Sequence, residues 1–334
     1  MPSAIVPMAE EKAHLGVLDG WRGISILLVL AAHLLPLGPK AWRLNETAGP
    51  MGMAIFFALS GFLITRFLLE RPSVPDFLVR RFFRIVPLAW LSLVVVLPLT
   101  GAQAEQYLPN FLFYANLPPF PLTEVAGHFW SLCVEMQFYV AVALIVALLG
   151  RRGLMLLPVL CLAVTLLRIV DGAMIEIVTW HRVDEILAGA TLALIHAGKL
   201  GQRTQAVLRR TSLFVVLPLF ALSSHPDSGL MNYLRPYLSA ALVGCTLFDP
   251  RADIARVLKS RVLAYLAKIS FALYVFHGLF MHSWLGDGER LAKYLKRPLL
   301  IAATFAAAHL STVYYEQRWI DLGRRLSERR KRAQ

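Results

Sequence analysis

The sequence predicts an all-α fold, a polytopic integral membrane helix bundle with about ten transmembrane helices. Of the 334 residues, 57% are hydrophobic, and the mean hydropathy is +0.59. Soluble globular domains are about half apolar at most. Several runs approach the ~20 apolar residues that a helix needs to cross a bilayer. The basic residues are also distributed unequally between the segments that join these runs. These observations favour a multi-pass membrane protein over a soluble one.

Ten segments are apolar enough to be predicted as spans. The seventh is the weakest, because Pro218 interrupts it and two arginines lie near its start. The predicted organisation is a short cytoplasmic N-terminal segment (1–16), one transmembrane domain (17–320) and a basic cytoplasmic tail (321–334). The predicted spans are residues 17–38, 51–70, 85–101, 128–150, 153–171, 180–198, 206–224, 230–248, 265–286 and 298–320.

The positions of Lys and Arg predict the orientation of the bundle. With the N-terminus placed in the cytoplasm, 25 of the 34 basic residues lie in inner segments and 6 in outer loops. Cytoplasmic loops carry such an excess, so both termini are predicted to be cytoplasmic. The net charge of +13 therefore reflects membrane topology, and no nucleic-acid partner is predicted. The N-terminus lacks the basic region and clear cleavage site of a signal peptide, so the first span is expected to remain as an anchor.

Three further segments carry specific expectations. The basic outer segment GERLAKYLKR (288–297) is predicted to form an interfacial helix. Residues 102–127 contain four prolines and no Lys or Arg; they either dip back into the membrane under a cover of protein or form an ordinary surface loop. In FFALSGFLI, Ser60 and Gly61 are small residues that let two helices approach closely.

The first span, LDGWRGISILLVLAAHLLPLG, carries two ionisable residues, Arg22 and His33. They are eleven residues apart, which corresponds to ~16 Å along a helix and an angular offset of only about 20°. Both are therefore predicted on one face, with Arg22 at the cytoplasmic boundary and His33 toward the outer half. The alternative is two unrelated residues, one snorkelling and one packed.

The fourth span opens with GHFWSLCVEMQFYV and carries Glu135. Its helical rise places Glu135 ~10 Å below the outer surface and His33 ~22 Å above the inner boundary. In a hydrocarbon layer of ~30 Å these depths nearly coincide. We therefore expect either a catalytic pair, in which Glu135 orients the His33 base, or a structural bridge between two helices.

The inner segment RRFFRIVP holds Arg81 and Arg84 three residues apart, on one face if the segment is helical. Together with Arg22 they are predicted to form an anion site at the cytoplasmic boundary, because a guanidinium binds two phosphate oxygens at once. The alternative is simple anchoring of the bundle by inner positive charge.

Polar residues of later spans complete the candidate site. WHRVDEILAG places Arg182, Asp184 and Glu185 at the outer end of the sixth span, where they grip an acceptor or form an interfacial charge network. His277 lies mid-membrane in the ninth span, and Glu316 lies near the cytoplasmic end of the tenth. A lone intramembrane histidine is more often a structural partner than a catalyst. No cysteine pattern of a disulfide framework or metal pair is present, and no metal is predicted.

Several of these motifs, in this order, resemble those of acyltransferase family 3, a group of membrane acyltransferases. The resemblance extends from Leu18 to about Trp319. It implies that Arg22 and His33 match the paired Arg and His of the family, and that RRFFRIVP matches its RxxR element. Cys133 and Met136 depart from the family pattern. The motifs are LDGWRGISILLVLAAH, FFALSGFLI, RRFFRIVP, HFWSLCVEMQFY, RVDEILAG, ISFALYVFH and YYE.

The resemblance implies transfer of an acyl group, with acetyl expected, from cytoplasmic acyl-CoA to a hydroxyl at or beyond the outer face. The acceptor would be a cell-surface or lipid-linked glycan, and the protein would lie in the bacterial inner membrane without a permanently bound cofactor. No appended esterase-like domain is expected. In this interpretation His33 and Glu135 are catalytic, and Arg22, Arg81 and Arg84 bind acyl-CoA. The acceptor-side or supporting residues are Trp130, Arg182, Asp184, His277 and Glu316.

Two other classes of protein fit the same polar residues. A transporter or flippase also uses intramembrane His, Glu and Arg, but it would be expected to show internal repeats, and the sequence has none. A structural or assembly subunit would tolerate neutral replacement of His33 and Glu135.

Overall fold

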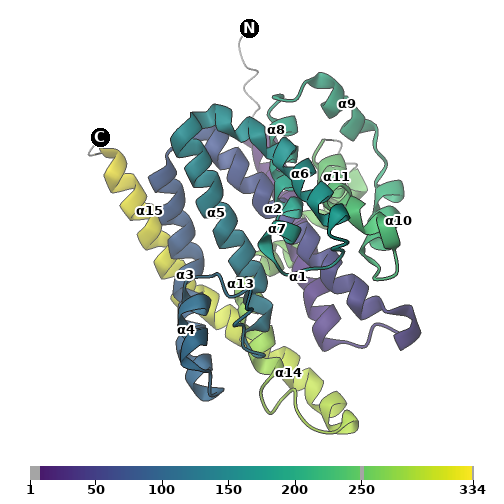
Figure 1. Cartoon of the computed structure of the whole chain (residues 1–334), viewed down its shortest axis with the longest axis vertical. Helices are drawn as coiled ribbons and strands as arrows, with labels where there is room; N and C mark the ends of the chain where they lie inside the picture. Colours follow the sequence, from purple (N-terminus) through teal and green to yellow (C-terminus); the bar gives the residue numbers. More distant parts are fainter. Residues whose placement is uncertain (1–7, 249–251, 333–334) are drawn as a thin grey trace.

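The computed structural model describes residues 8–248 and 252–332, and the regular structure within these ranges is helical (Figure 1). Short 3-10 helices η1 (Lys40–Trp42), η2 (Gly127–Phe129), η3 (Gly150–Leu156) and η4 (Gly229–Leu234) join several of the α-helices. The α-helices are α1 (Met8–Leu34), α2 (Leu44–Glu70), α3 (Val74–Leu99), α4 (Ala104–Phe111), α5 (Trp130–Leu149), α6 (Leu157–Val170), α7 (Thr179–Arg182), α8 (Asp184–His196), α9 (Gln202–Arg210), α10 (Leu213–Ser224), α11 (Arg235–Phe248), α12 (Ala252–Leu258), α13 (Arg261–Met281), α14 (Arg290–Ser311) and α15 (Gln317–Arg332).

The predicted all-α, multi-span character is confirmed, but the count of ten spans is not. Within the described ranges, six helical stretches are long and apolar enough to cross a membrane, or seven if the bent pair α9 and α10 is one span. The difference has a physical cause. Helices α8 and α11 have 13 and 14 residues, fewer than the ~20 that a single crossing needs. Helices α9 and α10 meet at 89° instead of forming the continuous seventh span.

The centre of the bundle is built on close contacts of α2 with α8 and of α1 with α2 and α13. A side chain at Gly61 would place its Cβ 1.8 Å from the Ile186 carbonyl oxygen, and one at Gly189 would lie 1.9 Å from that of Ala58. Only glycine allows two backbones to approach this closely. The expectation that small residues bring α2 against a neighbour is therefore confirmed.

Helix α3 positions the arginines of RRFFRIVP. The Ser73 side chain caps its first turn by accepting a hydrogen bond from the Asp76 amide at 3.4 Å, and Pro75 is the second residue of the helix. Both features favour a helix start. The helix then continues to Leu99, so Arg81 and Arg84 lie on a helix as the anion-site prediction requires.

Residues 290–332 form one long helical run. Residues 288–297 do not form a separate interfacial helix, because from Arg290 they are the first turns of α14. A π-helical turn, η5 (Thr312–Glu316), joins α14 to α15, which packs along α3 (Figure 1). The tail predicted at 321–334 is therefore helical as far as Arg332. Residues 1–7 of the predicted N-terminal segment lie outside the described ranges.

Residues 102–127, the predicted outer segment, are covered by protein over part of their length. They contain α4, and Gln137 donates a hydrogen bond of 2.9 Å to the Phe113 carbonyl. The buried Asn116 side chain donates to the Ile177 carbonyl and to Thr179, each at 2.9 Å. These bonds are compatible with both predicted forms, a segment that dips into the membrane under a cover of protein and a surface loop.

Candidate active site

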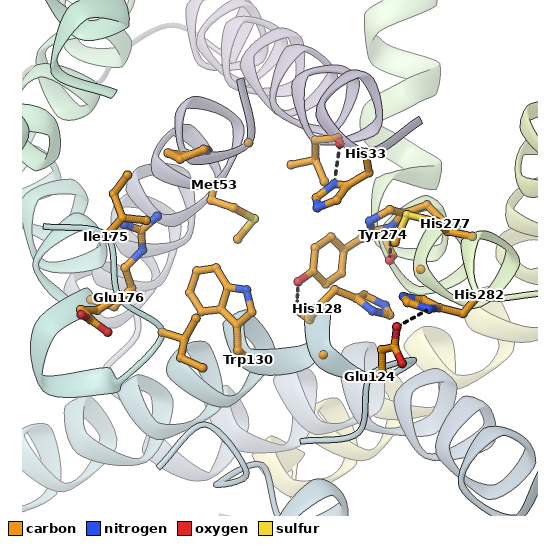
Figure 2. A pocket seen from close by; sticks show the side chains of 18 residues that line it. His33, Met53, Glu124, His128, Trp130, Ile175, Glu176, Tyr274, His277 and His282 are labelled. Carbon is orange, nitrogen blue, oxygen red and sulfur yellow. Dashed lines mark hydrogen bonds and ion pairs between the residues drawn. The ribbon is translucent and has the colours of Figure 1, made fainter. Parts of the chain in front are cut away.

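A cavity of about 340 Å³ lies near the C-terminal ends of α1 and α13. Three imidazoles from different elements meet in it: His33 from α1, His128 from η2 and His277 from α13 (Figure 2). The ring centroids of His33 and His277 are 5.2 Å apart, and those of His128 and His277 are 5.1 Å apart. The rim of this histidine cavity carries Glu124, whose carboxylate lies 3.8 Å from the His282 ring.

Backbone carbonyls fix the tautomers of the histidines. His33 Nδ1 lies 2.8 Å from the Val29 carbonyl oxygen, and His277 Nδ1 lies 2.6 Å from that of Tyr274. A carbonyl only accepts, so each Nδ1 is the donor, and Nε2 of the neutral ring is left with a free lone pair. Figure 2 shows the His33 ring directed into the cavity. His33 thus has the form that a general base requires.

The third ring, His128, depends on a glycine. Its Nε2 lies 3.2 Å from the Val275 carbonyl oxygen, while the Tyr274 hydroxyl donates to the His128 carbonyl. A Cβ on Gly278 would lie 2.3 Å from the His128 ring, so Gly278 makes room for it. In the described ranges no group of three or more His, Cys, Asp or Glu side chains is arranged as a metal site.

A second cavity, of about 320 Å³, gathers arginines. The sequence-predicted set Arg22, Arg81 and Arg84 lines it together, so these residues from α1 and α3 are brought to one site. Arg80 of α3 and Arg324 of α15 line the same arginine cavity. Arg80 is oriented by a hydrogen bond of 3.1 Å that its Nε donates to Ser327. Such a group of guanidinium side chains suits phosphate oxygens.

A narrow cavity of about 20 Å³ lies beside the stretch of α1 between these two sites. It shares Val29, Met53 and Tyr274 with the histidine cavity, and Ser25 also lines it. Residues 22, 25, 29 and 33 follow one another at helical spacings of three or four, so they form one stripe of α1. One side of a single helix therefore faces all three cavities.

The predicted contact between His33 and Glu135 is not formed in the described part of the chain, where no hydrogen bond joins them. Glu135 instead accepts bonds from Ser60, at 2.6 Å, and from Tyr139. The Tyr139 ring in turn lies 5.6 Å below the Arg81 guanidinium. The contact was predicted from equal depth in the membrane, and depth does not fix the direction in which a side chain points. Glu135 is buried and bonded to two hydroxyl groups, and through Tyr139 it is connected to Arg81 of the arginine cavity.

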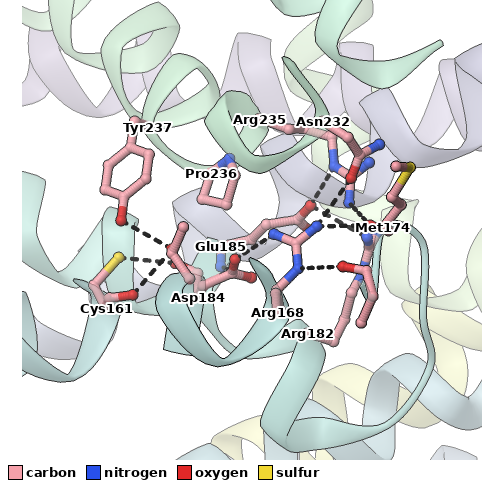
Figure 3. Close-up of polar contacts among 12 residues, drawn as sticks. Cys161, Arg168, Met174, Arg182, Asp184, Glu185, Asn232, Arg235, Pro236 and Tyr237 are labelled. Carbon is pink, nitrogen blue, oxygen red and sulfur yellow. Dashed lines mark hydrogen bonds and ion pairs between the residues drawn. The ribbon is translucent and has the colours of Figure 1, made fainter. Parts of the chain in front are cut away.

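The acidic residues of the sixth predicted span also have partners. Asp184 forms an ion pair of 2.5 Å with Arg168, and Glu185 one of 2.7 Å with Arg235 (Figure 3). Both carboxylates are fully buried, so they belong to a charge network, the alternative considered above. Arg182 differs, because it lines the histidine cavity and stacks 5.4 Å above the Trp130 ring.

Glu316 lines neither of the two main cavities, but its carboxylate interacts electrostatically with Arg84 of the arginine cavity. It is buried in η5, where Thr312 of the same turn donates a hydrogen bond of 2.7 Å to it. Sequence reasoning missed His128, Tyr274, Arg80 and Arg324. The sequence offered weak signals for two of them, since His128 begins the motif HFW and Arg80 is the first arginine of RRFFRIVP.

Comparison with known proteins decides the family. The pattern of a family described as an acyltransferase domain matches residues 15–316. The chain belongs to acyltransferase family 3. This match covers most of the acyltransferase and confirms the resemblance inferred from its motifs. No solved structure matches it.

Its curated relatives include bacterial O-acetyltransferases. The peptidoglycan O-acetyltransferase OatA of Listeria monocytogenes serovar 1/2a is 24% identical over 353 residues, which cover 92% of this chain and 56% of the relative. The O-acetyltransferase OatA of Staphylococcus aureus strain NCTC 8325 is 24% identical over 324 residues, or 83% and 52% of the two chains. The chain thus spans about half the length of these relatives.

Proposed function

We propose that this acyltransferase moves an acetyl group from cytoplasmic acyl-CoA to a hydroxyl group of a glycan acceptor on the other side of the membrane. The observation that carries the proposal is the arrangement along α1. An arginine cavity lies at Arg22, a histidine cavity lies at His33, and a narrow cavity lies between them. The names of the relatives, which include a peptidoglycan O-acetyltransferase, support O-acetylation of a cell-wall or other surface glycan.

The arginine cavity would bind the donor. Arg22, Arg81 and Arg84 face its phosphate groups, and Arg80 and Arg324 add to the same positive field. The positive-inside distribution of Lys and Arg supports a cytoplasmic position for this cavity. The acyl-pantetheine arm would follow the stripe of α1 toward His33. The narrow cavity is too small to hold the arm as it stands, so binding would require the side chains that line it to move.

His33 would act as general base. Its Nε2 takes the proton of the acceptor hydroxyl while the hydroxyl oxygen attacks the thioester carbonyl. The tetrahedral intermediate collapses, the carbon–sulfur bond breaks, and the departing CoA thiolate takes the proton from His33. A base of this kind contributes ~10²–10⁴-fold to the rate. A relay through acetyl-His33 is the rival mechanism, and it predicts radiolabel on the protein when acceptor is absent.

Glu135 would act at a distance from His33. It fixes Tyr139, which supports the Arg81 guanidinium. We therefore assign Glu135 to the alignment of the donor site, in place of the direct contact with His33 expected from depth. His277, whose Nδ1 is held by the Tyr274 carbonyl, would pack beside the His33 ring and help to fix its orientation.

The assignment of His33 is tested with the full chain in lipid nanodiscs, [¹⁴C]acetyl-CoA and soluble glycan acceptors. His33→Ala is expected to reduce acetyl transfer by at least ~100-fold. His309→Ala is the matched control, because His309 lies on α14 and bonds to Tyr265 at 2.9 Å; its rate should equal that of wild type. Wild-type transfer by correctly folded His33→Ala would exclude the base role.

A further inference from the structure

Five charged side chains form a buried cluster between α6, α7, α8 and α11 (Figure 3). They are three guanidinium groups and two carboxylates, and each residue is at most 2% exposed. Buried charges at this depth require partners. With all five ionised, the cluster has one more positive charge than negative. The members are Arg168, Arg182, Asp184, Glu185 and Arg235.

Two of the arginines have close carboxylate partners. Arg168 bonds to Asp184 at 2.5 Å, to the Met174 carbonyl at 2.6 Å and to Asn232 at 2.9 Å. Arg235 bonds to Glu185 through its Nε at 2.7 Å. These pairs account for both carboxylates of the cluster. The third arginine therefore has no carboxylate of its own and only shares Glu185 with Arg235.

Arg182 is that third arginine. Its Nη1 lies 3.4 Å from the Glu185 oxygen that Arg235 already holds, and neither its Nε nor its Nη1 has a hydrogen-bond partner. The guanidinium is only 2% exposed, stacks on Trp130 and lines the histidine cavity. An unpaired buried donor on a cation is costly, so this group is prepared for an anion that enters from the cavity.

We propose that Arg182 binds an oxyanion group of the acceptor, a carboxylate or a phosphate, and so selects acidic glycans for acylation. This inference rests on the proposed O-acetyl transfer and names the substrate class of the same site. The planar fork of Arg182 matches two oxygens of either group, and the bound anion balances the excess charge of the cluster. Trp130 beneath the guanidinium keeps its plane fixed and presents an apolar ring to the sugar.

The other charged groups of the cavity agree with this direction of binding. Glu124 and Glu176 also line it, and both are exposed. Exposed carboxylates are screened by water and salt, whereas the Arg182 charge is buried and is screened much less. An acidic substituent of the acceptor is therefore favoured at the inner end beside Arg182 and disfavoured at the rim.

The test uses matched acceptors. Full-length enzyme in nanodiscs is supplied with acetyl-CoA and one of three β-1,4-linked disaccharides: a disaccharide acid, its primary amide, or a counterpart that bears phosphate in place of the carboxylate. For wild type, kcat/KM for at least one acidic acceptor should exceed that for the amide by ~10–100-fold, mainly through KM. Which acid is preferred identifies the group as carboxylate or phosphate.

Variants then connect the preference to Arg182. Arg182→Gln should remove it, so that this variant uses the acidic acceptors and the amide with equal kcat/KM, and Arg182→Lys, which keeps the charge but loses the fork, should retain part of it. Arg43→Gln is the control, because Arg43 pairs with Asp227 at 2.6 Å and does not line the cavity; its preference should be unchanged. Equal use of the acids and the amide by wild type overturns the inference but leaves O-acetyl transfer standing. Transfer to none of the three contradicts the proposed function itself.

Discussion

Gly278→Ala is a perturbation of a single methyl group whose effect can be worked out from the structure. The new Cβ would lie 2.3 Å from Cε1 and Nδ1 of His128, whereas ordinary contacts begin at 3.4 Å. The His128 ring would have to retreat by about 1 Å. It would then lose its bond of 3.2 Å to the Val275 carbonyl and its packing at 5.1 Å on His277.

The effect on activity should exceed the effect on stability. Overpacking costs ~1–3 kcal/mol, but alanine is favoured over glycine inside a helix by up to ~1 kcal/mol, so the net loss should be ~0–2 kcal/mol. A displacement of ~1 Å at an active site can reduce the rate ~100-fold. We expect kcat/KM for acetyl transfer to fall by ~10–100-fold, measured as release of CoA thiol, with a melting temperature only slightly lowered.

Two controls make the prediction specific to His128. Gly49→Ala adds the same methyl group to the same cavity, but its Cβ would meet only Ala32 at 3.6 Å, an ordinary contact; its rate should match wild type. In the double variant Gly278→Ala with His128→Ala the clash is gone, so its melting temperature should be at least that of His128→Ala alone. A wild-type rate for Gly278→Ala would refute the placement of the reaction in this cavity.

Three further predictions test other parts of the account. Replacing Arg81 and Arg84 together by Gln should raise KM for acetyl-CoA ~10–100-fold, since hydrogen bonds to charged groups contribute ~1.5–3 kcal/mol; an unchanged KM would reduce these arginines to anchors. Glu135→Gln should raise the same KM by a smaller factor and leave the pH dependence of kcat unaltered. A shifted pH profile would instead indicate that Glu135 contacts His33 directly. Asp184→Asn leaves Arg168 buried without its carboxylate and should cost ~3–5 kcal/mol, seen as loss of folded protein in detergent; a stable, active variant would contradict the structural role of this pair.

The sequence predicted the positions of the helices better than the number of times that they cross the membrane. Each of the ten apolar segments is mostly helical, because apolarity determines much of the local structure, although the seventh is broken between α9 and α10. The number of crossings depends on helix length and bending, and hydropathy does not report these. The short helices α8 and α11 are apolar because they are buried inside the bundle, and their sequences look the same as those of spans.

In the candidate site, too, the sequence predicted what depends on one helix and missed what depends on packing between helices. Arg22 and His33 share one helix, and Arg81 and Arg84 share another, so spacing alone placed each pair on one face. The partner of Glu135 depended on helix rotation and on which hydroxyl groups α2 and α5 present to each other, which no spacing rule contains. His128 fits into the site because Gly278 of α13 leaves room for its ring. This contact joins segments that are distant in sequence. Arg182 was predicted at the acceptor side, but that it shares its one carboxylate, Glu185, with Arg235 became visible only when all five charges could be placed.

The most direct test of the account is vectorial transfer in sealed proteoliposomes that contain the full chain in one orientation. Acetyl-CoA is confined to the side of the arginine cavity, and a membrane-impermeant glycan is placed on the side of the histidine cavity. The account predicts acetylated glycan on the His33 side and free CoA on the Arg22 side, with no product in either compartment for His33→Ala. Product that forms only when donor and acceptor share one compartment would contradict it.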